Sequence, residues 1–540
     1  MRRFAALWRL RVRRDRLQLP LWIVGTVLLA YAGYAGVTES YGSLADRQGI
    51  LAAARADPVI LMFRGLPSGP SAGAFLAFEV LPWLAVLAAL MTTFLAVRHT
   101  RAEEEEGTAE LVSATPAGRL SPTVATLTHG LTANLVLGAL TGLALTSTGL
   151  DPEGSWLTGA ATAATGVVFV GIGLTAAQVV RTSRAASSLT IWVLVVTFLL
   201  RGVGNAAGTP QGGLLRTASA WPAWLSPFGW AEQTRPFDEN LWWPVLLAAG
   251  CGIALGILAV LLQHARDMGA GFLAERPGPA QARPALSSST ALVWRLAFGG
   301  IVGWAVGGAL TGLLATTLGG VLGRVAGTNP AVVHVITRLA GSGSLDEAAI
   351  TVFFTMLGIV AGCCAVQTVV RARQEEVRGT AEPVLAAAVG RVRWLADHLV
   401  VATGAVVIIV AVAVAAGCIG LAAGGHDASD LYRTVLVDGG GQLVAASVFT
   451  AITGLILSLA PRVTVSLAWL LLILATMLGM FGPLLGMPGW TMNLSPFGVT
   501  PVVSGSGVEA RGLWWLLLAV AAGTSLCLAA MRRRQLAPAR

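Results

Sequence analysis

Long runs of apolar residues constrain this chain more than any other feature, because many of them reach 18 or more residues with little or no charge. A helix of about 20 apolar residues spans a hydrocarbon core of about 30 Å. Helices and closed barrels are the structures that satisfy every backbone hydrogen bond inside such a core. Barrel strands alternate apolar and polar residues, whereas these runs are apolar throughout. The sequence therefore predicts an all-α polytopic membrane protein.

Six apolar runs precede a break in the pattern. We place these spans at about residues 19–37, 74–97, 122–149, 157–180, 187–206 and 241–263. Residues 1–18 hold seven arginines among apolar side chains, so they are too charged to span and predict a helix on the membrane surface. Residues 264–290 are polar and rich in Pro and Ser, which predicts a linker.

Beyond the linker the same landmarks return in the same order. The first charged segment (residues 101–119) is matched by a second charged segment (residues 373–391) at an offset of 272, with 11 of 19 positions identical. The pentapeptide Leu225-Ser-Pro-Phe-Gly229 returns as Leu494-Ser-Pro-Phe-Gly498. This repetition predicts an internal duplication. We expect about twelve transmembrane helices in two parallel six-helix repeats, at residues 1–263 and 291–540.

Each charged segment has the pattern of a helix that breaks and restarts. Gly107 permits a break, Thr108 can cap a new helix, and Glu110 suits the positive end of that helix's dipole. The second segment repeats these three residues as Gly379, Thr380 and Glu382. We therefore predict two short surface helices, within coupling elements 98–121 and 371–393, on which a soluble partner docks.

The distribution of arginine predicts the orientation. All 36 basic residues are arginine. With both charged segments, both termini and the linker in the cytoplasm, that side holds 26 arginines and leaves 10 for the other, which the positive-inside rule prefers. We expect a multi-pass protein of the plasma membrane with both termini in the cytoplasm. The arginines are scattered among the spans, so we expect no nucleic-acid partner.

The motif Glu-Glu-x-x-Gly-Thr-x-Glu followed by Arg, after the second of six spans, resembles the permease subunits of type-2 ATP-binding-cassette exporters. The duplicated form with Ser-Pro-Phe-Gly before the last span is similar to actinobacterial exporters of polyketide antibiotics or multiple drugs. This resemblance implies that each charged segment docks on a nucleotide-binding subunit. By position, the docking residues are Glu103, Glu104, Gly107, Thr108, Glu110 and Arg119, then Glu375, Glu376, Gly379, Thr380, Glu382 and Arg391.

One departure separates the two charged segments. Glu105-Glu106 of the first is replaced by Val377-Arg378 in the second. The two docking elements are therefore expected to differ.

The resemblance also implies partners. We expect two copies of an ATPase subunit that hold ATP and Mg²⁺, a lipid bilayer around the spans, and a hydrophobic or amphipathic substrate such as an antibiotic. A phosphate-binding loop needs a lysine, and the chain has none. We therefore expect a chain that is not an enzyme by itself and carries no cofactor. The five cysteines lie in apolar runs without suitably spaced partners, so we expect no metal site.

Four polar residues fall within or near the spans, where ionisable groups are costly and are candidates for function. They are Glu79, His129, Asn134 and Arg201, the candidates for a substrate pathway. Glu79 and Arg201 lie near span ends, so snorkelling or mutual pairing is the simpler interpretation. A lone histidine such as His129 is more often a hydrogen-bond partner between helices. Neither His129 nor Asn134 has a polar counterpart in the second half, where the offset of 272 gives valine.

Two other classes of function are open at this point. A twelve-span secondary transporter coupled to protons needs carboxylates inside the membrane, and among the spans we expect only Glu79 in that role. A membrane-embedded enzyme or scaffold needs clustered acids or histidines. The polar stretches 38–72 and 424–440 offer scattered ones, namely Asp57, His426, Asp427 and Asp430.

Overall fold

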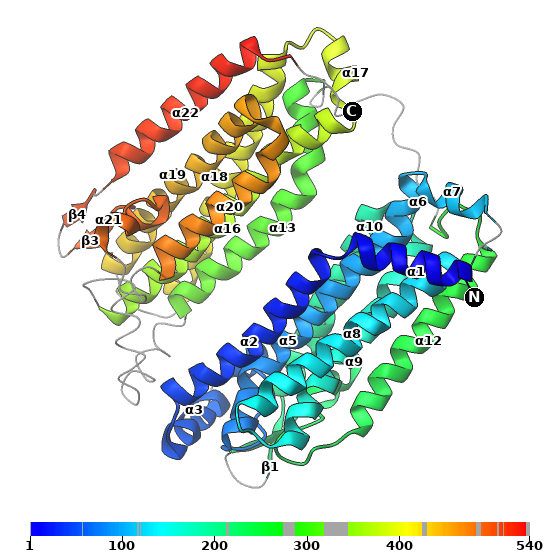
Figure 1. Ribbon diagram of the computed structural model, residues 1–540. Coiled ribbons are helices and arrows are strands. Elements are labelled where there is room, and N and C mark those ends of the chain that lie inside the picture. Colours follow the sequence, from blue (N-terminus) through cyan, green and yellow to red (C-terminus); the bar gives the residue numbers. More distant parts are fainter. Residues whose placement is uncertain are drawn as a thin grey trace. The chain divides into compact units, whose positions relative to one another are not determined.

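A computed structural model describes residues 2–56, 58–115, 118, 120–211, 215–273, 284, 287–317, 344–423, 429–481, 488–504, 507–510 and 512–535. The chain divides into two compact units, Met1–Pro277 and Gly278–Arg540 (Figure 1). In the described part of the chain, twelve helices are long and apolar enough to cross a membrane, which confirms the predicted all-α polytopic membrane fold. Residues 274–283 and 285–286 of the predicted linker, together with Asp57, Arg119, His426 and Asp427, lie outside the described residues.

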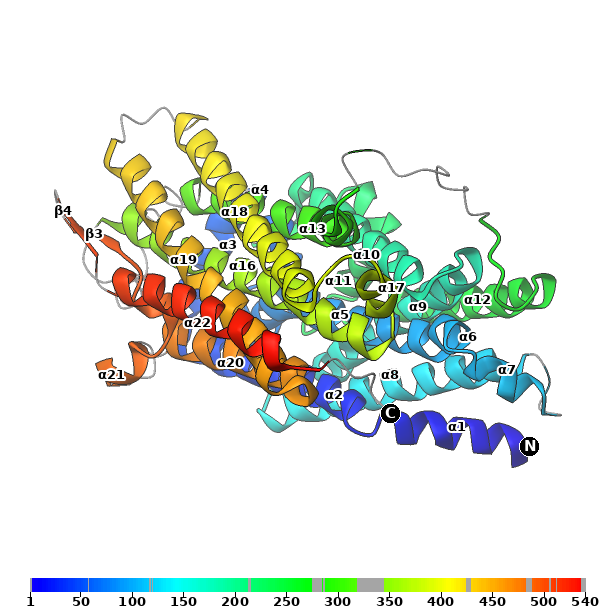
Figure 2. The same cartoon turned by 90° about the horizontal axis from the view of Figure 1, so that it is seen from above.

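The first unit begins with two consecutive helices, α1 (Arg2–Arg14) and α2 (Gln18–Ser40), which a short turn separates in Figure 2. Its other long helices are α5 (Ala72–Val97), α8 (Ser121–Ser147), α9 (Pro152–Val179), α10 (Ser183–Ala206) and α12 (Trp243–Ala265). The span of α5 extends to Glu105, through the π-helix η1 (Arg98–Ala102) and the short α6 (Glu103–Glu105).

Two helices form the centre of the first unit. The spans of α9 and α5 are 83% and 72% buried, whereas those of α2, α10 and α12 lie at the periphery. Close approach of α8 and α9 depends on glycine, because a Cβ atom at Gly159 would lie 2.2 Å from the carbonyl oxygen of Gly138. Small residues of this kind allow helices to pack closely in a membrane.

Short elements fill the two polar stretches of the first unit. Residues 38–72 contain α3 (Leu44–Ala56) and α4 (Pro58–Phe63). Residues 207–240 contain the antiparallel strands β1 (Thr209–Gln211) and β2 (Arg216–Ala218), the 3₁₀ helix η2 (Trp221–Leu225) and α11 (Pro227–Glu232). The hydroxyl of Ser226 accepts from the backbone N–H groups of Phe228 and Gly229 and so caps α11.

The second unit contains α13 (Ser289–Thr317), α16 (Leu345–Val377), α17 (Ala381–Ala386), α18 (Arg391–Ala423) and α19 (Ser429–Leu459). It continues with η4 (Pro461–Val463), α20 (Thr464–Thr476), the π-helix η5 (Met477–Phe481), α21 (Gly489–Met492), η6 (Pro496–Gly498), the antiparallel strands β3 (Val502–Ser504) and β4 (Gly507–Glu509), and α22 (Leu513–Arg533). The helix α22, red in Figure 1, lies at the edge of its unit.

The packing of the second unit follows the same order as that of the first. The spans of α19 and α16 are the most buried, at 72% and 56%, and those of α13, α20 and α22 are peripheral. The repeated pentapeptide has the same place in both units. Phe228 packs on Phe169 of α9 with ring centroids 5.5 Å apart, and Phe497 stacks on Phe449 of α19 at 5.4 Å. Each pentapeptide thus anchors a loop to the buried fourth long helix of its unit.

Candidate functional site

Both charged segments contain the predicted break. In the first unit Gly107 has φ +73° and precedes α7 (Thr108–Ser113). In the second unit Gly379 has φ +72° and precedes α17. Glycine adopts this left-handed conformation without steric cost, so the expected position of each break is confirmed. Figure 1 shows α7 at the end of the first unit that also carries α1 and α6.

The expectation that Thr108 and Thr380 cap the new helices through their hydroxyls is wrong. Among the described residues, neither hydroxyl accepts a helix-start N–H group. Instead Thr108 Oγ1 donates to the carbonyl oxygen of Glu103 at 3.0 Å, and Thr380 Oγ1 donates to that of Glu375 at 3.3 Å. Carbonyl groups at a helix C-terminus lack a partner in that helix. Each threonine hydroxyl therefore caps the C-terminal end of the preceding helix.

Glu104 holds the first charged segment to the last helix of its unit. Its Oε2 lies 2.6 Å from Nη1 of Arg101, and its Oε1 lies 2.5 Å from Nη2 of Arg266, the residue that follows α12. Arg101 also donates to the carbonyl oxygens of Ala177 and Ala270, both at 2.9 Å. This network therefore joins the ends of α5, α9 and α12.

Glu376 has the same role in the second unit. Arg373, which corresponds to Arg101, lies 3.1 Å from Glu376 Oε2, and Arg534, the residue that follows α22, binds Oε1. Arg534 also donates to the carbonyl oxygen of Leu457 at the end of α19. The same arginine–glutamate–arginine network is thus present in both units.

Glu105 explains part of the difference between the two charged segments. Its Oε1 accepts from the backbone N–H of Ser183 at 2.8 Å, and its Oε2 accepts from the hydroxyl of Ser183. Ser183 is the first residue of α10, so the carboxylate satisfies one of the free N–H groups at that helix start. The second unit has the half-exposed Val377 at this position. The first charged segment therefore has a contact with the fifth long helix that valine cannot make.

The two short helices present different surfaces. On α7, Glu110 is exposed and Leu111 is 74% exposed. On α17, Glu382 is exposed, whereas Leu385 packs against a hydrophobic cluster that includes Trp394. The remaining predicted docking residue of the second unit, Arg391, starts α18 and donates to the carbonyl oxygen of Arg534 at 2.5 Å.

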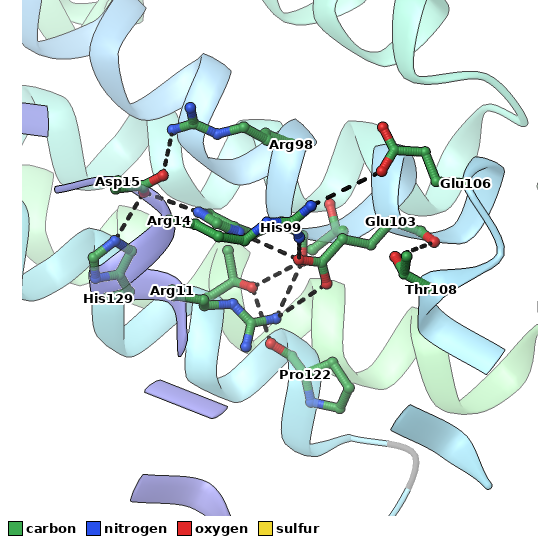
Figure 3. A network of polar contacts seen from close by, with 12 residues as sticks. Arg11, Arg14, Asp15, Arg98, His99, Glu103, Glu106, Thr108, Pro122 and His129 are labelled. Atoms are coloured by element: carbon green, nitrogen blue, oxygen red, sulfur yellow. Dashed lines mark hydrogen bonds and ion pairs between the residues drawn. The ribbon is translucent and has the colours of Figure 1, made fainter. Parts of the chain in front are cut away.

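Glu103 belongs to a second network, shown in Figure 3. Its Oε1 accepts from Arg14 at 2.8 Å and lies 3.4 Å from Nδ1 of His99. The Nε2 atoms of His99 and His129 lie 2.9 and 3.0 Å from Oδ2 of Asp15, in the turn between α1 and α2. The expectation that His129 is a hydrogen-bond partner between helices is confirmed.

The surroundings of Asp15 shift the pKa of its carboxyl. Burial raises the pKa of its carboxyl, but hydrogen bonds from His129 and His99 and the positive charges of His99 and Arg98 outweigh burial. The resulting pKa lies well below the ordinary value of an aspartate.

Glu79 and Arg201 do not pair with each other, contrary to one expectation. Glu79 binds the guanidinium of Arg64. Arg201, which is fully buried, lies 2.5 Å from Glu232 Oε1 and donates to the carbonyl oxygens of Met62 and Arg64 at 2.7 and 2.8 Å. Arg64 thus contacts both predicted partners. Its guanidinium group binds Glu79, and its backbone carbonyl oxygen accepts a hydrogen bond from Arg201.

Asn134 faces α9 at close range. Its Nδ2 donates to the carbonyl oxygen of Gly130 in its own helix at 2.8 Å. A Cβ atom at Gly166 would lie 1.8 Å from Asn134 Oδ1, so the amide fills the space that glycine leaves. In the structure Asn134 is therefore a packing residue at the contact of α8 and α9.

Sequence reasoning missed several charged residues of these networks. Asp15 is a single acidic residue among the seven arginines of residues 1–18. A lone acid in a basic helix is itself a signal for an ion pair. Arg266 and Arg534 each follow the sixth span of their half, and this shared position is a sequence signal that the two arginines have the same role. Besides Glu79, the described spans contain the buried carboxylate of Asp438 in α19, so the expectation that Glu79 stands alone is wrong.

The twelve apolar helices define a polytopic α-helical membrane protein. The family model described as the C-terminal domain of multidrug efflux system permease Rv1217c matches residues 5–262 and 286–532. The chain is 37% identical over 531 residues to the multidrug efflux system permease protein Rv1217c of Mycobacterium tuberculosis (strain H37Rv), over 98% of this chain and 94% of the relative. The chain belongs to this permease family.

Proposed function

We propose that this chain is the transmembrane subunit of an ATP-driven exporter that moves hydrophobic or amphipathic compounds, such as antibiotics, out of the cell. ATP is hydrolysed on a separate ATP-binding-cassette subunit, of which two copies dock on the two charged segments. The termini and both segments face the cytoplasm, and the membrane is the plasma membrane. The relative's name, multidrug efflux system permease, supports the class of substrate.

The observation that carries this proposal is the repeated construction of the charged segments. Each unit breaks a long helix at a left-handed glycine and then forms a short helix with an exposed acid, Glu110 or Glu382. Each unit also fixes that break to its last helix through a largely buried glutamate, Glu104 or Glu376. A rigidly held surface helix can transmit movement of a docked subunit to the spans, because the buried pairs prevent it from moving alone. Two arrangements of this kind in one chain suit two ATPase copies.

The sequence supports a separate source of energy. A phosphate-binding loop requires lysine, and the chain contains none. Co-expression with a cassette ATPase from a neighbouring reading frame, followed by co-purification, tests the partnership. We expect efflux from vesicles that requires ATP and is blocked by vanadate.

Charge reversal on both short helices tests the docking assignment. We expect Glu110→Arg together with Glu382→Arg to abolish stimulation of the ATPase by substrate while membrane insertion is retained. Glu39→Arg, an exposed glutamate near the end of α2, is the matched control and should leave stimulation unchanged. Full stimulation in the double variant would exclude these helices as the docking sites.

Asp438 allows a test against proton coupling. A secondary transporter needs a carboxylate that gains and loses a proton within the membrane, and Asp438 is buried in α19. If the chain purified alone transports drugs on a proton gradient, and Asp438→Asn removes that transport, the ATP-driven proposal is wrong. Efflux that resists an uncoupler supports it.

A further inference from the structure

Three metal-binding side chains converge at one end of the first unit. Asp15 Oδ2, His99 Nε2 and His129 Nε2 all lie within 4.8 Å of one another (Figure 3). They come from three places in the fold, namely the turn before α2, the π-helix η1 and the helix α8. The side chains of Asp15, His99 and His129 are 1%, 0% and 3% exposed. These are the ligand types of a site with two imidazoles and one carboxylate.

His99 lies between two carboxylates. Carboxylate oxygens face both of its ring nitrogens, with Asp15 Oδ2 2.9 Å from Nε2 and Glu103 Oε1 3.4 Å from Nδ1. In metal sites the nitrogen that does not bind the ion donates its N–H to a carboxylate or carbonyl. Glu103 is placed to accept that N–H.

We propose that Asp15, His99 and His129 bind one divalent transition-metal ion of the zinc class. Zinc lies about 2.0–2.2 Å from nitrogen and oxygen ligands in tetrahedral geometry, which separates ligand atoms by about 3.3 Å. The present separations of 2.9 and 3.0 Å must therefore open by a few tenths of an ångström. Water takes the fourth position. Oδ1 of Asp15 stays with Arg98, whose Nη2 lies 2.9 Å away.

Neighbouring charges select the class of metal. Arg98 pairs with Asp15, and Arg14 and Arg11 lie 2.8 and 3.8 Å from the oxygens of Glu103. These guanidinium groups oppose an ion held by charge alone, so they disfavour Mg²⁺ and Ca²⁺, which prefer several oxygen ligands. Imidazole ligands favour Zn²⁺, Ni²⁺ or Co²⁺. The ion would link the turn between α1 and α2 to η1 and α8.

The second unit has a different arrangement at the matching positions. The offset of 272 places Arg371 at the position of His99 and Val401 at that of His129. Arg371 Nε lies 3.4 Å from Glu375 Oε1, so a permanent positive charge stands beside the glutamate that corresponds to Glu103. Among the described residues, the three ligands are therefore not repeated at the matching positions of the second unit, where His398 Nε2 also lies 3.5 Å from Glu375 Oε2.

The test measures metal on the full chain, purified with a tag that contains no histidine. The protein is stripped with a chelator, incubated with Zn²⁺, freed of excess ion and measured by mass spectrometry of the metal. We expect about one Zn²⁺ per chain, and loss of that ion in His129→Val and in Asp15→Asn. Glu103→Gln should weaken binding about 10- to 100-fold, as the loss of an outer partner does.

Two other histidines are the controls. His264→Ala, at the exposed end of α12, and His398→Val, buried in the second unit, should keep the metal. Visible absorption of Co²⁺-loaded wild-type protein gives a reading that does not depend on the folding of any variant, and a tetrahedral spectrum that Zn²⁺ displaces is expected. If wild type binds none of Zn²⁺, Ni²⁺ and Co²⁺, or if the His129→Val/Asp15→Asn double variant keeps its full content, the proposal is overturned.

Discussion

Arg266 Nη2 lies 2.5 Å from Glu104 Oε1, although 162 positions separate the two residues in the chain. Both side chains are largely buried. The same relationship joins Arg534 to Glu376 in the second unit. In each case the arginine directly follows the last long helix of its unit. A buried carboxylate needs a partner, and in each unit it finds one at the end of a distant helix.

Removal of this arginine tests the network. Arg266→Ala leaves Glu104 with Arg101 as its remaining partner, so we expect a loss of about 1–3 kcal/mol in unfolding free energy. Thermal unfolding in detergent measures it, with Arg184→Ala, an exposed arginine of α10, as the control. The Arg266→Ala/Glu104→Ala double variant should lose less than the sum of the two single losses. Strict additivity would show that the two residues are not coupled.

The Glu105 contact predicts a difference between the units. Glu105→Ala removes an acceptor from the start of α10, and we expect a loss of about 1 kcal/mol, as for a lost helix cap. Val377→Ala, at the matching position, changes a half-exposed side chain, so its effect should stay within about 0.5 kcal/mol. Unfolding of both variants in detergent compares the two values, and equal losses would contradict the assigned contact.

The left-handed glycines predict strain on substitution. Gly107→Ala places a Cβ atom at φ +73°, which costs about 1–2 kcal/mol. We expect a lower unfolding midpoint and weaker stimulation of the proposed partner ATPase. Gly404→Ala is the matched control, because an added Cβ there meets open space within α18, and it should be neutral or slightly stabilising. A normal midpoint for Gly107→Ala would mean that the break does not require glycine.

Substitution of Arg201 distinguishes a structural role of this residue from a role in substrate binding. Arg201→Met leaves Glu232 buried without its charged partner, and we expect a loss of about 3–5 kcal/mol in unfolding free energy. Arg64→Met should cost less, because the Arg64 side chain is 35% exposed. A second change, Glu232→Gln, should restore part of the loss in the Arg201 variant. If Arg201→Met instead changes substrate affinity at unchanged stability, Arg201 contacts substrate.

Much of the fold follows from the sequence because hydropathy dictates it. The spans at 122–149 and 187–206, for example, appear as Ser121–Ser147 and Ser183–Ala206. The break at Gly107 also follows, because only glycine adopts that conformation at low cost. The hydroxyl of Thr108 was misjudged, since its partner is a carbonyl of the preceding helix and local pattern does not tell which end a threonine serves.

The charged networks could not be read from local sequence. The choice between Glu79 and Glu232 as partner of Arg201 depends on how α4, α10 and α11 meet, and periodicity contains no such information. Asp15, His99 and His129 likewise come together through tertiary packing alone. Glu104 and Glu376 are recognisable from the sequence because the two charged segments are similar. Their arginine partners Arg266 and Arg534 lie far along the chain and are not.

A pair of identical subunits inherits every mutation in duplicate, so its two halves cannot specialise. A polypeptide that contains both units is free of this restriction. Glu105 and Val377 occupy matching places under separate codons, and one contacts a helix that the other cannot contact. A mutation of Glu105 or of Val377 changes one unit and leaves the other unit unchanged. Differences between the two units can therefore arise and be inherited without a second gene.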